Sequence, residues 1–166
     1  MSKRTRQYAG LLSAVLAYYL VHEGAHLLYA LLTGSFKAVN FMGLGMQIDI
    51  WRERLTDAQL GVFCLAGAAA TFAASCLLVI FAGSICKASS KMFKACMYYV
   101  TIAMLLLDPL YLSVLCGFFG GGDMNGIALL VPEAAARIGF GVLLVINAAV
   151  FFRVVLPRYK KAFENV

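Results

Sequence analysis

Two histidines and a glutamate lie close together in the segment HEGAH, where His22, Glu23 and His26 match the pattern H-E-x-x-H. In a helix, histidines four residues apart are offset by about 40° around the axis and about 6 Å along it, so both rings can reach one metal ion. Zinc favours such donors and, with one open coordination position, activates a water molecule. Glu23 is then expected to be the general base that moves a proton from this water to the leaving amine. The segment predicts one zinc ion per chain.

The surroundings of this segment favour a metal site over a purely structural cluster. His22 and His26 are the only histidines of the sequence, and with Glu23 they lie within a long apolar stretch. Each ionisable group at the centre of a bilayer costs on the order of 2 to 3 kcal/mol. A polar cluster that only joins helices regains about 1 kcal/mol per hydrogen bond. Because this gain is smaller than the cost, a metal-binding role is the better explanation of the three residues.

A third protein ligand has to come from another part of the sequence, and two aspartates are candidates. Asp108 lies inside an apolar stretch and precedes Pro109, which kinks helices and frees backbone groups. Asp123 follows three glycines, which allow a tight turn, and it is placed to cap a new helix. Asp108 could instead orient a histidine through a hydrogen bond, and Asp123 could be a simple helix cap. The residue types and positions leave both aspartates open as ligands.

The elements that must hold these residues are apolar helices. Of the 166 residues, 63% are hydrophobic and 13% are charged. The mean hydropathy of +0.86 is far above that of an ordinary soluble domain. A hydrocarbon core about 30 Å thick needs about 20 residues of helix to cross it, and four stretches suffice: Tyr8 to Leu32, Leu60 to Gly83, Met92 to Phe119, and Ile138 to Leu156. The sequence therefore predicts an all-α, multi-pass integral membrane protein, with a single domain over residues 1–166.

The charged residues lie mainly between these stretches and indicate the orientation of the chain. Basic residues gather in the amino-terminal MSKRTR, in the loop SICKASSKMFK, and in the tail around Arg153, Arg158, Lys160 and Lys161. Four crossings with both termini in the cytoplasm place all three groups on the cytoplasmic side, as the positive-inside rule requires. The net charge of +6 is explained by this topology, so nucleic acid is not an expected partner. The five cysteines are scattered and predict no disulfide framework.

Two connecting segments are expected to depart from regular helix. Residues 46–50 alternate in polarity, which indicates either a short β-hairpin that could hold a substrate by strand addition, or an interfacial loop anchored by Trp51. Around residues 108–131, the proline and the glycines predict a broken or re-entrant segment. In the second apolar stretch, small residues recur every four positions, which predicts closely packed helices; they include Gly67, Thr71 and Ser75.

The combination of HEGAH in the first apolar stretch with a much later aspartate in a glycine-containing turn resembles the site-2 protease family of intramembrane zinc metalloproteases. The resemblance covers residues 8–131 and implies that His22, His26 and Asp123 bind zinc, with Glu23 as general base. The chain has Asp-Met-Asn-Gly where the family usually has Asp-Gly. No PDZ-like or CBS-like regulatory domain is visible in the sequence, so the resemblance implies a minimal form that is regulated by membrane partners or by access.

These features predict a metalloendopeptidase that hydrolyses a peptide bond in or near the transmembrane segment of a membrane protein. Its expected partners are such a membrane protein or peptide substrate and the lipid bilayer. One alternative is a metal-binding membrane protein without hydrolytic activity, such as a transporter or a peptidase-like chaperone, although Glu23 argues against it. Another is a zinc peptidase with Glu133 as third ligand, although Glu133 follows Pro132 and is placed to start the last helix.

Overall fold

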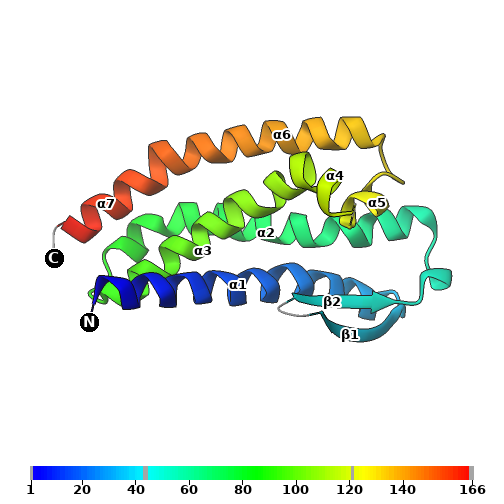
Figure 1. Ribbon diagram of the computed structural model, residues 1–166, viewed down its shortest axis with the longest axis horizontal. Helices are drawn as coiled ribbons and strands as arrows, with labels where there is room; N and C mark the ends of the chain where they lie inside the picture. The colour runs from blue at the N-terminus through cyan, green and yellow to red at the C-terminus, as the bar shows by residue number, and fades with distance from the viewer. Residues whose placement is uncertain (1, 43–44, 121, 165–166) are drawn as a thin grey trace.

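Four long helical segments run along the length of the molecule (Figure 1). The computed structural model describes residues 2–42, 45–120 and 122–164. Each of the four segments has the length and hydropathy needed to cross a membrane. They begin with the helices α1 (Lys3–Leu32), α2 (Asp57–Cys86), α3 (Lys91–Leu110) and α6 (Glu133–Val150). The four segments contain the four predicted stretches, which confirms the predicted helical architecture.

Side-chain caps fix where three of these helices begin. Ser2 accepts a hydrogen bond from the backbone N–H of Thr5 at the start of α1. Thr56 and Gln59 form a reciprocal capping box at the start of α2, and Ser90 caps α3. Such caps satisfy backbone N–H groups that the first helical turn leaves without partners. The helices therefore start in polar segments, outside the apolar stretches that the hydropathy reveals.

The third and fourth segments each contain a π-helical turn. The third continues from α3 through Tyr111–Leu115 into α4 (Cys116–Phe119). The fourth continues from α6 through Phe151–Val155 into α7 (Leu156–Glu164). The first of these turns follows Pro109, which lies inside α3 and cannot donate a backbone hydrogen bond to the preceding turn.

The predicted break around residues 108–131 is confirmed, and it lies between α4 and α5 (Asp123–Ile127). Gly120 has φ +82° and Gly122 has φ +49°, values that side-chain-bearing residues rarely adopt. Gly121, the middle glycine of the three, lies outside the described residues. After this break, α5 packs against α2 (Figure 1).

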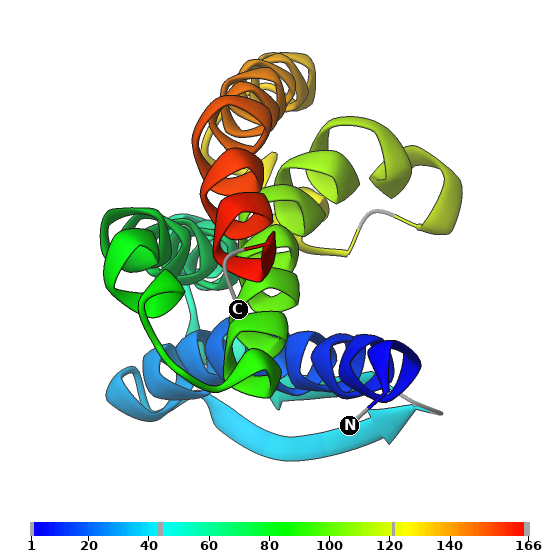
Figure 2. The same ribbon diagram turned by 90° about the vertical axis from the view of Figure 1, so that its left-hand side faces the viewer.

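α1 packs against both α2 and α3, whereas α6 packs mainly on α3 and the turn that follows it. In the end view, α1 and α6 therefore lie on opposite sides of the molecule, with α2 and α3 between them (Figure 2). The two ends of the described chain lie at the same end of the molecule (Figure 1). This is the arrangement expected of an even number of crossings.

A two-stranded antiparallel sheet follows α1 and confirms the predicted hairpin. It consists of β1 (Phe36–Met42) and β2 (Gly45–Ile50), with Val39 opposite Ile48. The tip of the hairpin lies outside the described residues. The sheet runs beside the carboxy-terminal half of α1 (Figure 1), and β2 contacts that helix.

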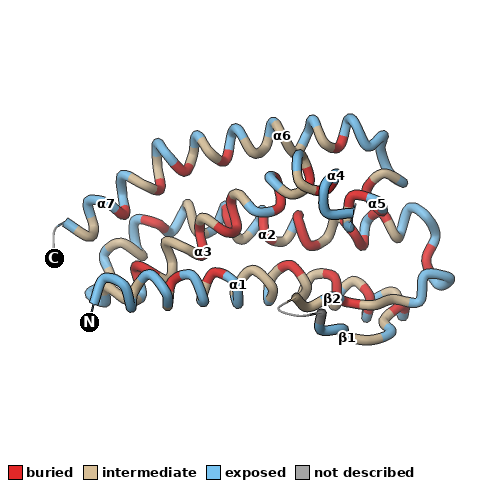
Figure 3. The backbone as a smooth tube through the Cα atoms, viewed as in Figure 1, coloured by how far each residue is buried: buried red, intermediate tan, exposed pale blue. Residues whose placement is uncertain are grey.

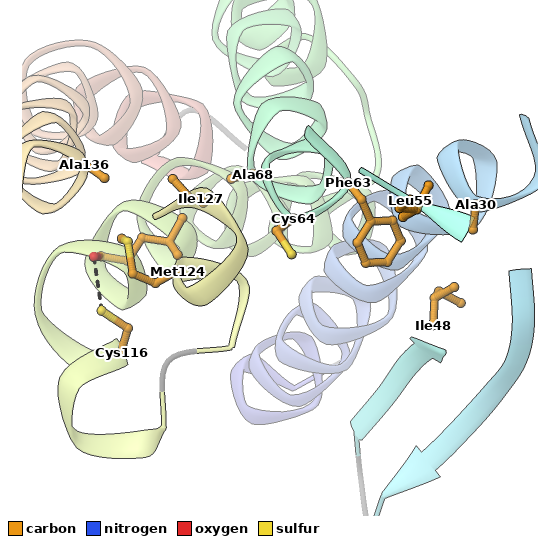
Figure 4. Packing of buried hydrophobic residues seen from close by; sticks show 11 residues of the cluster. Ala30, Ile48, Leu55, Phe63, Cys64, Ala68, Cys116, Met124, Ile127 and Ala136 are labelled. Atoms are coloured by element: carbon orange, nitrogen blue, oxygen red, sulfur yellow. Dashed lines mark hydrogen bonds between the residues drawn. The ribbon is translucent and has the colours of Figure 1, made fainter. Parts of the chain in front are cut away.

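One hydrophobic cluster joins the elements around the carboxy-terminal end of α1. Phe63, Cys64 and Ala68 of α2 lie between residues of α5 on one side and residues of α1 and β2 on the other (Figure 4). Elsewhere, buried positions concentrate on the inward faces of the helices, and the outward faces are exposed (Figure 3). The cluster therefore fixes α5 and β2 relative to the segment of α1 that carries HEGAH.

Candidate metal centre

The two histidines of HEGAH lie on a buried face of α1. His22 is 8% exposed and His26 is 3% exposed. Their Nε2 atoms are 3.2 Å apart, because residues four positions apart in a helix lie on the same face. The predicted convergence of both rings on one point is therefore present in the structure.

Asp123 approaches the same point from α5, a short helix more than ninety residues further along the chain. Its Oδ2 lies 3.2 Å from Nε2 of His22 and 3.5 Å from Nε2 of His26. The turn at Gly120 and Gly122 directs Asp123 inward. Gly126 then lets α5 lie against α2, because a Cβ at this position would be only 2.8 Å from Cβ of Cys64.

The three donor atoms form a triangle that fits a metal ion. Its edges measure 3.2, 3.2 and 3.5 Å. A tetrahedral ion bound at 2.0 to 2.1 Å separates its ligands by about 3.3 to 3.4 Å. His22, His26 and Asp123 therefore form a group that could hold one metal ion, and its donors are the ones that the sequence resemblance implies.

The other nitrogen of each imidazole faces an acceptor. Nδ1 of His26 lies 2.8 Å from the backbone oxygen of Phe63, and Nδ1 of His22 lies 3.2 Å from Oδ1 of Asp108. We assign the ring proton to Nδ1 in both residues, because each Nδ1–H then donates to an oxygen. This tautomer leaves the lone pair of each Nε2 free for a metal ion, and the acceptors hold the ring orientations.

Asp108 lies behind His22, on the side away from the donor triangle. It is 3% exposed and receives hydrogen bonds from the hydroxyl groups of Tyr18 and Thr71. Of the two candidate aspartates, the structure brings Asp123 to both Nε2 atoms and Asp108 to Nδ1 of His22. The orienting role considered for Asp108 matches this placement.

Tyr18 and the backbone of Phe63 are parts of the site that sequence reasoning missed. Tyr18 stands four residues before His22, so its position on the same helical face was open to inference. Its ring stacks on the imidazole of His22, with the centroids 5.2 Å apart. The sequence gives no indication of the acceptor at Phe63, because every residue carries a backbone carbonyl group.

Gly67 lies against the donor side of both histidines. A Cβ at this position would be 2.6 Å from Nε2 of His22 and 2.6 Å from Nε2 of His26. No atom can stay at such a distance without displacing the rings. The predicted close packing along this helix thus has a specific consequence, since only glycine leaves the donor atoms room.

Glu23 lies beside the metal-binding group and outside it. Its side chain lines a cavity of about 340 Å³ together with His26 and Asp123. Residues 46–48 of β2 form another wall of this cavity. The cavity therefore brings together a carboxylate, two of the three candidate metal ligands and a β-strand.

Glu133 takes no part in this group. It begins α6 and pairs with Arg137 in the next helical turn, with 3.4 Å between Oε1 and Nη1.

Comparisons with protein-family models, curated proteins and solved structures found no match to the chain. The functional assignment therefore rests on the geometry of His22, His26, Asp123 and Glu23.

Proposed function

We propose that the chain is a multi-pass membrane protein. Its four long helices expose rows of large apolar side chains, whereas a soluble helix keeps polar residues on its outer face. On α1, Leu12, Leu16 and Leu20 are 60, 62 and 74% exposed. They recur every four residues and form one outward face. Contact with lipid chains explains this face, and the basic ends of the helices then lie in the cytoplasm.

We further propose that His22, His26 and Asp123 bind one zinc ion. Two neutral imidazoles and one carboxylate at the corners of a tetrahedral face suit zinc, which takes three protein ligands in catalytic sites. Both rings are held by acceptors at Nδ1, as is usual for histidines that bind zinc. The edges of 3.2 to 3.5 Å between donors support this choice of ion. Calcium and magnesium prefer sites built of oxygen ligands.

The activity that this geometry supports best is peptide-bond hydrolysis of the site-2 protease type. Bound zinc supplies polarisation of a water molecule. The Glu23 carboxylate accepts a proton from the attacking water and passes it to the nitrogen of the leaving amine. His22 and His26 keep their rings fixed through their Nδ1–H donations while the proton moves. One observation carries this proposal, namely that Glu23 shares a cavity with two of the three converging metal-binding side chains.

The substrate in this proposal is an extended segment of a membrane protein. Met46, Gln47 and Ile48 line the cavity that holds Glu23, and in the two-stranded sheet β2 pairs on one edge with β1. Strand addition at the other edge of β2 would hold a substrate through backbone hydrogen bonds. Because His22 and His26 lie within an apolar helix, a membrane-spanning substrate reaches them most directly.

The experiment that tests this function separates metal binding from hydrolysis. The purified protein is analysed for zinc and assayed with fluorescently labelled casein, a generic unfolded substrate, and with a synthetic membrane-spanning peptide. Wild-type protein should contain about one zinc ion per chain and cleave at least one of the two. Glu23→Gln should keep the zinc and lose cleavage by about a hundredfold or more.

Glu53→Gln is the matched control, because Glu53 lies in the exposed turn Arg52–Arg54. It should behave like the wild type in both assays. Cleavage by Glu23→Gln at the wild-type rate would refute the mechanism. Zinc binding without cleavage of either substrate would favour the alternative of a metal-binding membrane protein without hydrolytic activity.

A further inference from the structure

A basic cavity of about 400 Å³ lies at the end of the molecule where the described chain begins and ends. Three segments that are far apart in sequence form it, namely the starts of α1 and α3 and the end of α7. Its basic side chains are Lys3, Arg6, Lys91 and Lys160. Glu164 is the acidic side chain among the described residues that line it.

The amino-terminal ends of two helices add to the positive character of this cavity. Lys3 and Lys91 are the first residues of α1 and α3, helices of 30 and 20 residues. The amino-terminal end of a long helix carries a partial positive charge. A buried hydrogen bond also holds two of the segments around the cavity together. The buried Lys94 donates to the backbone oxygen of Ala162, with 2.9 Å between the two atoms, and so holds α7 across α3.

An apolar groove continues from this cavity along α1 and α3. Its volume is about 390 Å³, and Tyr99 lines both spaces. Apolar and aromatic side chains form its walls, among them Leu11, Val15 and Leu107. These three side chains are between 44 and 56% exposed, so the groove is open along the side of the molecule. A ligand that fits both spaces needs an anionic head and a hydrocarbon chain.

We propose that the basic cavity and the apolar groove together bind one anionic phospholipid. The phosphate group lies among Lys3, Arg6, Lys91 and Lys160, and one acyl chain runs between α1 and α3 past Tyr99. Basic pockets between membrane helices bind the headgroups of such lipids, and each nearby lysine or arginine contributes about 1 kcal/mol of electrostatic attraction. A neutral membrane-spanning helix would also suit the groove, but it would make no use of the basic side chains of the cavity.

The far end of the groove reaches residues that border the metal centre. Tyr18 and Tyr19 line it, and Tyr18 donates to the carboxylate that orients His22. Tyr19 also lines the cavity that contains Glu23. A bound acyl chain therefore contacts residues of the site. The inference rests on the proposed location in a membrane, and it does not depend on peptidase activity.

The test measures lipid retention by native mass spectrometry of the purified chain in detergent. Phosphatidylglycerol and phosphatidylcholine with identical acyl chains are titrated in parallel. We expect one phosphatidylglycerol per chain, retained about tenfold more strongly than phosphatidylcholine. The triple variant K3Q/R6Q/K160Q should lose this preference. Its control, K87Q/R158Q/K161Q, removes the same number of charges from a separate cavity at the same end of the molecule and should keep it.

Two further arms identify which part of the lipid is bound. Glycerol 3-phosphate, which lacks acyl chains, should not displace phosphatidylglycerol at equal concentration. Val15→Trp, placed in the open groove, should weaken retention although every basic residue is intact. Chelation of the metal should change none of these results, so failure of the lipid site and failure of the zinc site can be told apart.

Three outcomes would overturn the proposal. Equal losses in the two triple variants would mean that the lipid responds only to overall charge. Displacement by glycerol 3-phosphate would assign the basic cavity to a soluble phosphate. Binding of a neutral membrane-spanning peptide in place of phosphatidylglycerol would assign the groove to a protein segment.

Discussion

The imidazole of His26 on α1 is oriented by the backbone of Phe63 on α2, with 2.8 Å between Nδ1 and the carbonyl oxygen. His22 is oriented differently, by the side chain of Asp108. One ring is thus held by a group that no substitution removes, and the other by a carboxylate that can be replaced. A mutation can therefore disturb the orientation of His22 without disturbing that of His26.

The first prediction uses this difference to separate the two aspartates. Asp123→Ala removes a donor atom from the triangle and should abolish zinc retention. Asp108→Ala removes only the acceptor behind His22, so zinc affinity should fall by about 10- to 100-fold and remain measurable. Competition with a chromophoric chelator gives both affinities. Full loss in Asp108→Ala together with retention in Asp123→Ala would exchange the roles of the two residues.

The second prediction concerns Gly67, where the methyl group of an alanine should collide with the two imidazole rings. In Gly67→Ala the new Cβ would lie 2.6 Å from both Nε2 atoms, and the Nδ1 acceptors resist rotation of the rings. Zinc content should therefore fall severalfold or more, while the helical circular dichroism stays unchanged. Gly24→Ala is the control, since Gly24 lies within HEGAH but its Cβ would meet nothing within 4 Å. A Gly67→Ala protein with full zinc would contradict the donor geometry.

The sequence predicted the helices well because long apolar stretches of about 20 residues or more are a direct signal of long apolar helices. It underestimated the lengths of three of the four segments by several residues, since capped ends such as those at Ser2 and Thr56 are polar and hydropathy does not detect them. The histidine pair was predictable because four-residue spacing defines a helical face. The residue types alone did not predict which of Asp108 and Asp123 reaches the two Nε2 atoms. This depends on how the chain turns back at Gly120 and Gly122.

The third prediction tests whether β2 holds the substrate. Ile48 lines the same cavity as Glu23. Ile48→Pro removes the backbone N–H group at this position, so cleavage of casein and of the membrane-spanning peptide should fall by about tenfold or more. Zinc content should be unchanged, because no donor atom lies on β2. Ile48→Val, which keeps the N–H group, is the control. Normal cleavage by the proline variant would rule out strand addition at this edge.

The last prediction concerns stability after metal removal. Three donors from α1 and α5 converge within 3.5 Å of one another, so a bound ion links the first helix to the segment that follows the third. Binding to the folded state alone contributes about 2.7 kcal/mol when free zinc is about 100 times its Kd. Chelation should therefore lower the unfolding temperature of the wild type in detergent, and added zinc should restore it. Asp123→Ala should unfold at one temperature with or without the chelator. If the wild type also showed no shift, the three residues would not be a metal site in the folded protein.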